Sequence, residues 1–148
     1  MALRENFPNE PVKITLPRIY DPRGSLTVVE EQNQIPFDIA RVYWIYDVPG
    51  GEERGAHSHR KLQQLMMAVS GSLDIEVTDG FTTKVFTLNK PFEGLYLPPG
   101  IWRRMFNFSS GSCLLSIVSL PYDEKEYIRD YDEFIENARK RGPIITQE

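Results

Sequence analysis

The sequence predicts an all-β protein of the sandwich type, followed by one C-terminal amphipathic helix. Short segments rich in β-branched and aromatic residues recur along the chain, and Gly, Pro and Asp-Gly turn signals separate them. Nothing alternates strand with helix, as a parallel α/β sheet would require. Short strands with turn signals at this spacing are typical of a β-sandwich.

The strands follow one another closely. Residues 12–16 alternate as an early strand, and a Pro/Gly turn over residues 20–24 leads into the next. Residues 39–47 form a long strand rich in aromatic side chains. Asp79-Gly80 is a two-residue hairpin signal. The other expected strands are 25–30, 62–69, 73–77, 83–88, 94–100, 102–108 and 113–120.

Only the C-terminal tail changes its period. Apolar side chains recur there at three- and four-residue steps, which predicts an amphipathic helix that packs on the sandwich or on a second subunit. The helix should end at Gly142-Pro143. The residues that carry this period are Tyr127, Ile128, Tyr131, Phe134, Ile135 and Ala138.

Size and composition set broad limits on the function. A chain of 148 residues is most simply one domain, residues 1–148. Its net charge of −4 argues against a general affinity for nucleic acid or anionic membranes. The only cysteine, Cys113, excludes an intrachain disulfide, and no apolar run approaches membrane length. We expect a cytoplasmic protein.

Both histidines of the chain lie one residue apart, at His57 and His59. On a strand, residues i and i+2 share a face, so the two imidazoles should point the same way. Their spacing to neighbouring residues fits the two motifs of a cupin-type jelly roll. The matching positions are Gly51, His57, His59, Gln64 and Gly71, then Pro98, Gly100, Arg103 and Asn107.

The two departures from the cupin pattern argue against a metal. A metal-binding cupin has Glu at the position of Gln64 and His at the position of Arg103. A guanidinium offers no lone pair and repels a cation. We therefore expect no metal and no cofactor, and two free imidazoles with pKa values near neutrality that can exchange protons. The alternative is a pair of hydrogen-bonded structural histidines.

Arginine and tyrosine side chains complete the candidate site. Arginine suits phosphate groups and developing oxyanions. Arg23 stands out because the adjacent Gly24 can aim it inward. Tyr43, on the long strand, could donate a proton or stack on a sugar, although core packing is an equal alternative. Arg41, Arg54 and Arg103 are further candidates for contacts with phosphate groups or oxyanions.

Five motifs in order resemble the nucleotide-sugar 3,4-ketoisomerases of the WxcM-like cupin family. They are Asp21-x-Arg23-Gly24-x-Leu26, Arg41-Val-Tyr43, Arg54-Gly-x-His57-x-His59-x-Lys61-Leu62-x-Gln64, Tyr96-x-Pro98-Pro99-x-x-Trp102 and the segment from Tyr122 to Phe134. The resemblance runs from about Tyr20 to Phe134. Some family members have a tyrosine directly before the motif arginine, where this chain has Pro22.

The resemblance implies a function and a set of site residues. The family moves the ketone of dTDP-4-keto-6-deoxy-D-glucose from C4 to C3 without metal or redox cofactor, on the way to 3-amino-3,6-dideoxy sugars of surface polysaccharides and natural products. Its members are homodimers that exchange N-terminal strands. The family's base falls on His57, the second histidine on His59, and the active-site arginine and tyrosine on Arg23 and Tyr43. Arg41, Arg54, Gln64, Trp102 and Arg103 are the expected substrate-binding residues.

Three rival functions remain open at this level. A 3,5-epimerase of 4-keto-6-deoxy nucleotide sugars would exchange protons at C3 and C5 and leave the ketone in place. A non-catalytic cupin would bind a nucleotide sugar without turnover. A metal-dependent dioxygenase would need a bound metal. The C4 configuration of a 3-keto product depends on which face of C4 is reprotonated.

Overall fold

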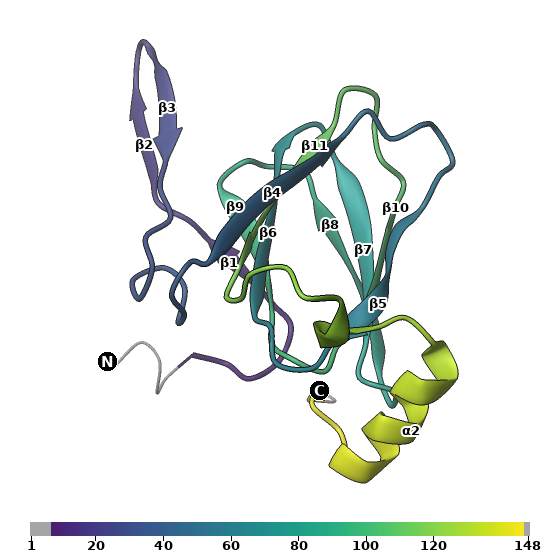
Figure 1. Cartoon of the computed structure of the whole chain (residues 1–148). Coiled ribbons are helices and arrows are strands. Elements are labelled where there is room, and N and C mark those ends of the chain that lie inside the picture. The colour runs from purple at the N-terminus through teal and green to yellow at the C-terminus, as the bar shows by residue number, and fades with distance from the viewer. Residues whose placement is uncertain (1–6, 147–148) are drawn as a thin grey trace.

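Two five-stranded antiparallel sheets pack face to face, and a separate hairpin projects from them (Figure 1). The computed structural model describes residues 7–146, so the first part of the expected N-terminal lead-in lies outside the described residues. The first sheet has the order β1-β9-β6-β11-β4, and the second has the order β12-β5-β10-β7-β8. The all-β prediction is therefore confirmed.

The strands lie in the segments rich in β-branched and aromatic residues, and turn residues separate them. The strands of the first sheet are β1 (Val12–Thr15), β9 (Glu93–Leu97), β6 (Gln64–Ser70), β11 (Cys113–Val118) and β4 (Arg41–Tyr46). Those of the second are β12 (Tyr127–Ile128), β5 (Arg54–His59), β10 (Trp102–Phe106), β7 (Leu73–Thr78) and β8 (Thr83–Leu88). The β7–β8 hairpin turns at Asp79-Gly80, where Gly80 adopts φ +93°.

The main core lies between the two sheets. Side chains from β6, β7 and β9 meet there, among them Met66, Ile75 and Leu95, all fully buried. A second apolar cluster covers the outer face of the first sheet, where the segment that includes Ile35 and Phe37 packs on Leu65 and Tyr96. The two clusters fix the sandwich from both sides of β6.

The C-terminal helix begins later than the sequence predicts. Helix α2 covers Tyr131–Arg141, and the Asp130 carboxylate accepts a hydrogen bond from the Asp132 backbone N–H at its start. Tyr127 and Ile128 instead pair with His59 and Ser58 as the short strand β12, preceded by the 3₁₀ turn η1 (Glu124–Glu126). Strand pairing with β5 overrides the helical period in this segment.

The N-terminal hairpin was predicted only in part. The expected turn over residues 20–24 joins two strands, β2 (Arg18–Asp21) and β3 (Gly24–Thr27), which form a two-stranded sheet of their own within the described part of the chain. Figure 1 shows this hairpin extending away from the sandwich. Its apolar side chains are largely exposed, Tyr20 to 71%. Among residues 7–146, no helix is long and apolar enough to cross a membrane.

Candidate active site

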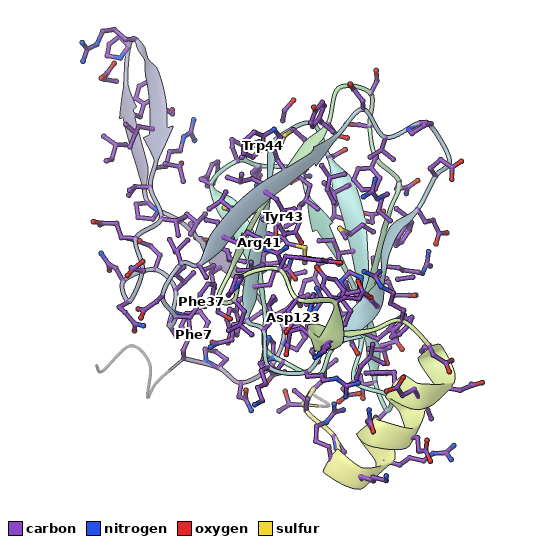
Figure 2. All side chains as sticks on the ribbon, viewed as in Figure 1. Phe7, Phe37, Arg41, Tyr43, Trp44 and Asp123 are labelled. Atoms are coloured by element: carbon purple, nitrogen blue, oxygen red, sulfur yellow. The ribbon has the colours of Figure 1, made fainter. Side chains whose placement is uncertain are left out.

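The candidate site is a cavity of about 380 Å³ at the open end of the sandwich. One wall is β4, a second is β5 with Met105 of β10, and the third is the segment of residues 122–129 that joins β11 to α2. Figure 2 shows Arg41 and Tyr43 along β4, facing the side where Asp123 begins η1. The lining residues are Arg41, Tyr43, Ile45, Arg54, Gly55, His57, Met105, Tyr122, Tyr127 and Arg129.

The two histidines meet as the sequence predicts. His57 and His59 occupy alternate positions on β5, and both rings are buried. Their Nε2 atoms are 3.1 Å apart, and the ring planes are nearly perpendicular, at 85°. One ring must donate and the other must accept in this contact, so a single proton lies between the two imidazoles.

The surroundings lower the pKa of both histidines well below the ordinary value, which corrects the expectation of pKa values near neutrality. Burial, followed by the charges of Arg103 and Arg129, lowers the pKa of His57 from 6.5 to about 3. Burial and the charges of Arg103, His57 and Arg41 lower the pKa of His59 further. Both rings are therefore neutral at physiological pH, and each keeps a nitrogen lone pair.

A hydrogen-bonded network forms the floor beneath the histidines. Gln64 lies at its centre: its Nε2 donates to the Tyr43 hydroxyl at 2.9 Å and to Ser116 Oγ at 2.6 Å. Its Oε1 accepts a short hydrogen bond of 2.5 Å from Arg103 Nη1. The Gln64 amide thus orients the Tyr43 phenol and accepts a bond from a buried guanidinium, and it lies in this network instead of among the cavity-lining side chains.

Arg103 is fully buried and pairs with His57 across the β5–β10 ladder. Burial lowers the pKa of its guanidinium to about 10, which leaves it protonated at neutral pH. A buried cation is costly unless it is compensated, and no carboxylate of residues 7–146 forms an ion pair with this one. The position of Arg103 below the histidines suits stabilisation of negative charge in the cavity, and does not suit a surface contact with a diphosphate.

The residues at the cupin metal positions do not form a ligand set. Among residues 7–146 no group of three or more His, Cys, Asp or Glu side chains is arranged to hold a metal ion. Gln64 and Arg103, at the remaining two positions, are bonded to each other.

Arg41 and Arg54 line the cavity, as expected of diphosphate-binding residues. The Arg41 guanidinium lies 5.2 Å from the Tyr43 ring centre and 5.6 Å from that of Tyr122. Its Nε is buried without a hydrogen-bond partner among the described residues, and the same is true of His59 Nδ1 and Arg103 Nη2. Unpaired buried polar atoms are uncommon in folded proteins, and three of them lie around the histidines.

Two expected site residues, Arg23 and Trp102, do not line the cavity of their own chain. Arg23 is at the tip of the β2–β3 hairpin, where its side chain is 90% exposed and forms an ion pair with Asp21 at 3.0 Å. Trp102 neighbours Arg103 on β10 and therefore points to the opposite face. It packs on Tyr131 and Phe134 of α2, with ring centres 5.1 and 5.5 Å away. Trp102 is therefore not among the residues that line this cavity, and its expected role in substrate binding stays a prediction.

Tyr122, Tyr127 and Arg129 line the cavity, although none of them was a predicted site residue. Their motif was present among the resemblance motifs, yet the helical period from Tyr127 onward favoured a packing role. A signal did exist: Asp130 is a good N-cap, and it would have placed Tyr127 and Arg129 before the helix.

A β-sandwich with two buried histidines beside an arginine-lined cavity defines a candidate acid–base site on a cupin-like fold. The chain matches the FdtA family, described as "WxcM-like, C-terminal", over residues 10–139. It belongs to this family.

Two similar proteins extend the comparison. The chain is 44% identical over 121 residues to the TDP-4-oxo-6-deoxy-alpha-D-glucose-3,4-oxoisomerase of Aneurinibacillus thermoaerophilus, which covers 82% of this chain and 87% of the relative. The 3,4-ketoisomerase QdtA from Thermoanaerobacterium thermosaccharolyticum, in a mutant form bound to TDP-4-keto-6-deoxyglucose, is 42% identical. It superimposes with a TM-score of 0.87 over 89% of this chain and 96% of QdtA.

A more distant likeness extends to the fold alone. NovW, a 4-keto-6-deoxy sugar epimerase from Streptomyces spheroides, superimposes with a TM-score of 0.69 at 20% identity, over 82% of this chain and 69% of NovW. The fold is therefore shared with a protein that is named as an epimerase and not as a ketoisomerase.

Proposed function

We propose that this protein is a sugar 3,4-ketoisomerase that moves the ketone of dTDP-4-keto-6-deoxy-D-glucose from C4 to C3. The observation that carries the proposal is the buried pair of neutral histidines, Nε2 to Nε2 at 3.1 Å, beside a cavity lined by arginines. Its similarity to the Aneurinibacillus and QdtA enzymes, both 3,4-ketoisomerases by name, supports the same substrate.

The chemistry follows from the arrangement of proton donors and cations. The hydrogen at C3 is α to the C4 ketone, and neutral His57 removes it. The enediolate that forms is stabilised by the Arg103 charge and the Tyr43 hydroxyl, which the Gln64 network holds in place. His59 shares a proton with His57 and relays it: the C3 hydroxyl loses its proton, the oxygen at C4 gains one, and a proton is returned to carbon C4, which leaves the ketone at C3 and a hydroxyl at C4. No metal or redox cofactor enters these steps.

Binding of the diphosphate is assigned to Arg41 and Arg54, which line the cavity. A guanidinium presents several N–H donors in a geometry that matches phosphate oxygens, and both of these guanidiniums belong to the cavity lining. Arg103 was a third candidate for binding the diphosphate, but its side chain is too deeply buried for that contact.

The exposed hairpin supports a homodimer with exchanged N-terminal strands. Ile19, Tyr20 and Leu26 of the hairpin are each more than half exposed, and Trp44 on the edge strand β4 is 58% exposed. A second copy of the chain would bury both surfaces. The same exchange would carry Arg23 into the partner's cavity, where it could stabilise the enediolate.

The setting of the enzyme is part of the proposal. We infer that residues 1–148 act as one cupin domain in the cytoplasm, where the lone Cys113 needs no disulfide partner. The 3-keto product is then a substrate for transamination in the synthesis of 3-amino-3,6-dideoxy sugars.

Product NMR tests the proposed reaction. Incubation of the purified protein with dTDP-4-keto-6-deoxyglucose in deuterated water should move the ketone from C4 to C3, and the His57→Asn variant should be slower by roughly 10²–10⁴-fold. Deuterium at C5 with the ketone still at C4 would identify a 3,5-epimerase. Tight binding of the sugar nucleotide without turnover would identify a non-catalytic cupin.

A further inference from the structure

The segment of residues 122–129, here called the strap, forms one wall of the cavity. It runs from β11 to α2, and Tyr122, Tyr127 and Arg129 line the cavity from it. The Glu126 carboxylate accepts hydrogen bonds from the backbone N–H groups of Lys61 and Leu62, at 2.5 and 2.8 Å. With the β12–β5 pairing, these bonds tie the strap to the strand that carries the histidines.

The ring of Tyr127 contacts both imidazoles. Its centre is 4.9 Å from that of His57 and 4.5 Å from that of His59, with interplanar angles of 55° and 60°. Because the two imidazole centres are themselves 4.8 Å apart, the three rings form a closed triangle. The His59–Tyr127 and His57–His59 contacts are edge-to-face and the His57–Tyr127 contact is tilted. Packing of this kind restricts the orientation of the imidazole rings, whose last side-chain torsion is otherwise broad.

An ion pair holds the Tyr127 ring from outside the triangle. The Arg129 guanidinium lies 4.5 Å from the Tyr127 ring centre. Glu124 binds Arg129 through two hydrogen bonds of 2.8 and 3.0 Å, and the Tyr122 hydroxyl donates to the same carboxylate. Because Arg129 and Glu124 are both more than half exposed, this ion pair adds little to the free energy of unfolding. Its geometric effect is to keep the cation over the ring.

We propose that Tyr127 is a positioning residue for the histidine pair: its ring holds His57 and His59 at relay distance, and the Glu124–Arg129 ion pair holds that ring. The role rests on the proposed isomerase function, because proton relay requires the two nitrogens to stay within hydrogen-bond reach. Tyr127 acts through the histidines and needs no contact of its own with the sugar.

The charges around the pair give the proposal a measurable signature. Arg103 from β10, Arg41 from β4 and Arg129 from the strap face the histidines, and Glu124 is the carboxylate that opposes them for His57. Tyr127 also shields the imidazoles from water. Loss of its ring should admit solvent, so the pKa values of the histidines should move up toward 6.5.

The test compares Tyr127→Phe with Tyr127→Leu. In untagged protein the chain has only two histidines, so imidazole NMR reports His57 and His59 directly. Wild type and Tyr127→Phe should keep both rings neutral between about pH 5 and 8, whereas Tyr127→Leu should show at least one ring that titrates there. For Tyr127→Leu we expect kcat to fall by roughly tenfold or more, with KM changed much less.

Two further variants complete the experiment. Tyr131→Leu removes an exposed tyrosine on α2, outside the cavity, and should leave the NMR spectrum and kcat unchanged. Arg129→Gln removes only the exposed Glu124–Arg129 ion pair, so this variant should fold even if Tyr127→Leu does not. It should raise the pKa of His57, because a nearby positive charge is lost.

Specific outcomes would overturn the proposal. Neutral histidines and unchanged kcat in Tyr127→Leu would show that the ring does not position the pair. The same result in Arg129→Gln would show that the Glu124–Arg129 ion pair is not needed to hold the Tyr127 ring. If Tyr127→Phe lost as much activity as Tyr127→Leu, the hydroxyl and not the ring would be the functional part. A wild-type protein that does not isomerise the sugar would refute the proposed function, yet the NMR comparison would still decide the positioning role.

Discussion

The acidity of His57 is the residue-scale property with the clearest kinetic consequence. A base must be neutral to act, and the pKa of His57 in the ligand-free chain is about 3. The acid limb of kcat/KM, which reports the free enzyme, should therefore be absent between about pH 5 and 8. A bound diphosphate favours the charged imidazolium and raises this pKa, so the acid limb of kcat should lie at higher pH than that of kcat/KM.

Initial rates across the pH range check this order of the two limbs. A kcat/KM limb near pH 6.5 would contradict it, because that value belongs to a solvated histidine. The rates should be compared with those of His59→Asn, in which the relay partner is lost while His57 remains.

Gln64 offers a second residue-scale prediction. Replacing it by Leu removes the acceptor of the buried Arg103 and the donor to Tyr43. A buried cation without its acceptor should lower the free energy of unfolding by about 2–3 kcal/mol, as measured by urea denaturation. Lys84→Ala, on the exposed edge strand β8, is the control and should change little. A loss below about 0.5 kcal/mol for Gln64→Leu would show that water satisfies Arg103 equally well.

Sequence spacing located the centre of the site at residue scale, but not its electrostatics. The cupin motif placed His57, Gln64 and Arg103 together, and the structure brings them together. The low pKa values could not be predicted, because they depend on the burial of both rings and on Arg129, which comes from a distant strap. Trp102 was predicted to bind substrate because the motif contains it, and alternation along β10 turns it toward α2 and away from the described cavity.

At the scale of elements, alternating patterns and turn signals were sufficient for the sandwich strands and insufficient for short pairings. The helical period was read from Tyr127, yet β12 forms there because its two residues pair with β5. Within the described part of the chain, the N-terminal strands β2 and β3 form a two-stranded sheet of their own and bury little apolar surface. Their pattern therefore carried too weak a signal to predict both.

Asp79 anchors the C-terminal element, and it supplies a prediction at this scale. Its side chain accepts hydrogen bonds from four backbone N–H groups, of Phe81 and Thr82 in the turn and of Ile144 and Ile145 after α2. Asp79→Ala would leave these donors unpaired in a buried place, and should cost about 3 kcal/mol or more in urea denaturation. It should also make the segment after Gly142 sensitive to limited proteolysis.

Asp79→Asn separates the effect of charge from that of shape. The amide keeps one acceptor oxygen, so this variant should lose less stability than Asp79→Ala. Equal losses would indicate that the charge of the carboxylate holds the tail. A tail that stays resistant to protease in Asp79→Ala would contradict the anchoring role.

At the scale of the whole molecule, the proposed site residues lie in two separate places of one chain. His57 and Tyr43 lie in the cavity, whereas Arg23 lies on a hairpin that extends away from it. If two copies exchange hairpins, every active site combines His57 of one subunit with Arg23 of the other. The exposed apolar residues of the hairpin and of β4 then become a subunit interface instead of an unusual surface.

Subunit complementation tests this arrangement. His57→Asn and Arg23→Ala homodimers should each be nearly inactive, because every site lacks one of the two residues. In a mixed dimer the hairpin exchange gives one site both defects and the other site neither. Unfolding and refolding an equal mixture should therefore recover roughly one quarter of the wild-type activity, since half of the dimers are mixed and each has one intact site.

The matched control is a mixture of His57→Asn with Tyr43→Phe. Because His57 and Tyr43 lie in the cavity of the same chain, mixed dimers of these variants contain no intact site and should recover nothing beyond the activity of their parents. Recovery in the Arg23 mixture alone would place Arg23 in the partner's cavity. No recovery in either mixture, with dimers confirmed by sedimentation, would mean that Arg23 does not act across the interface, and the hairpin would then need a different role.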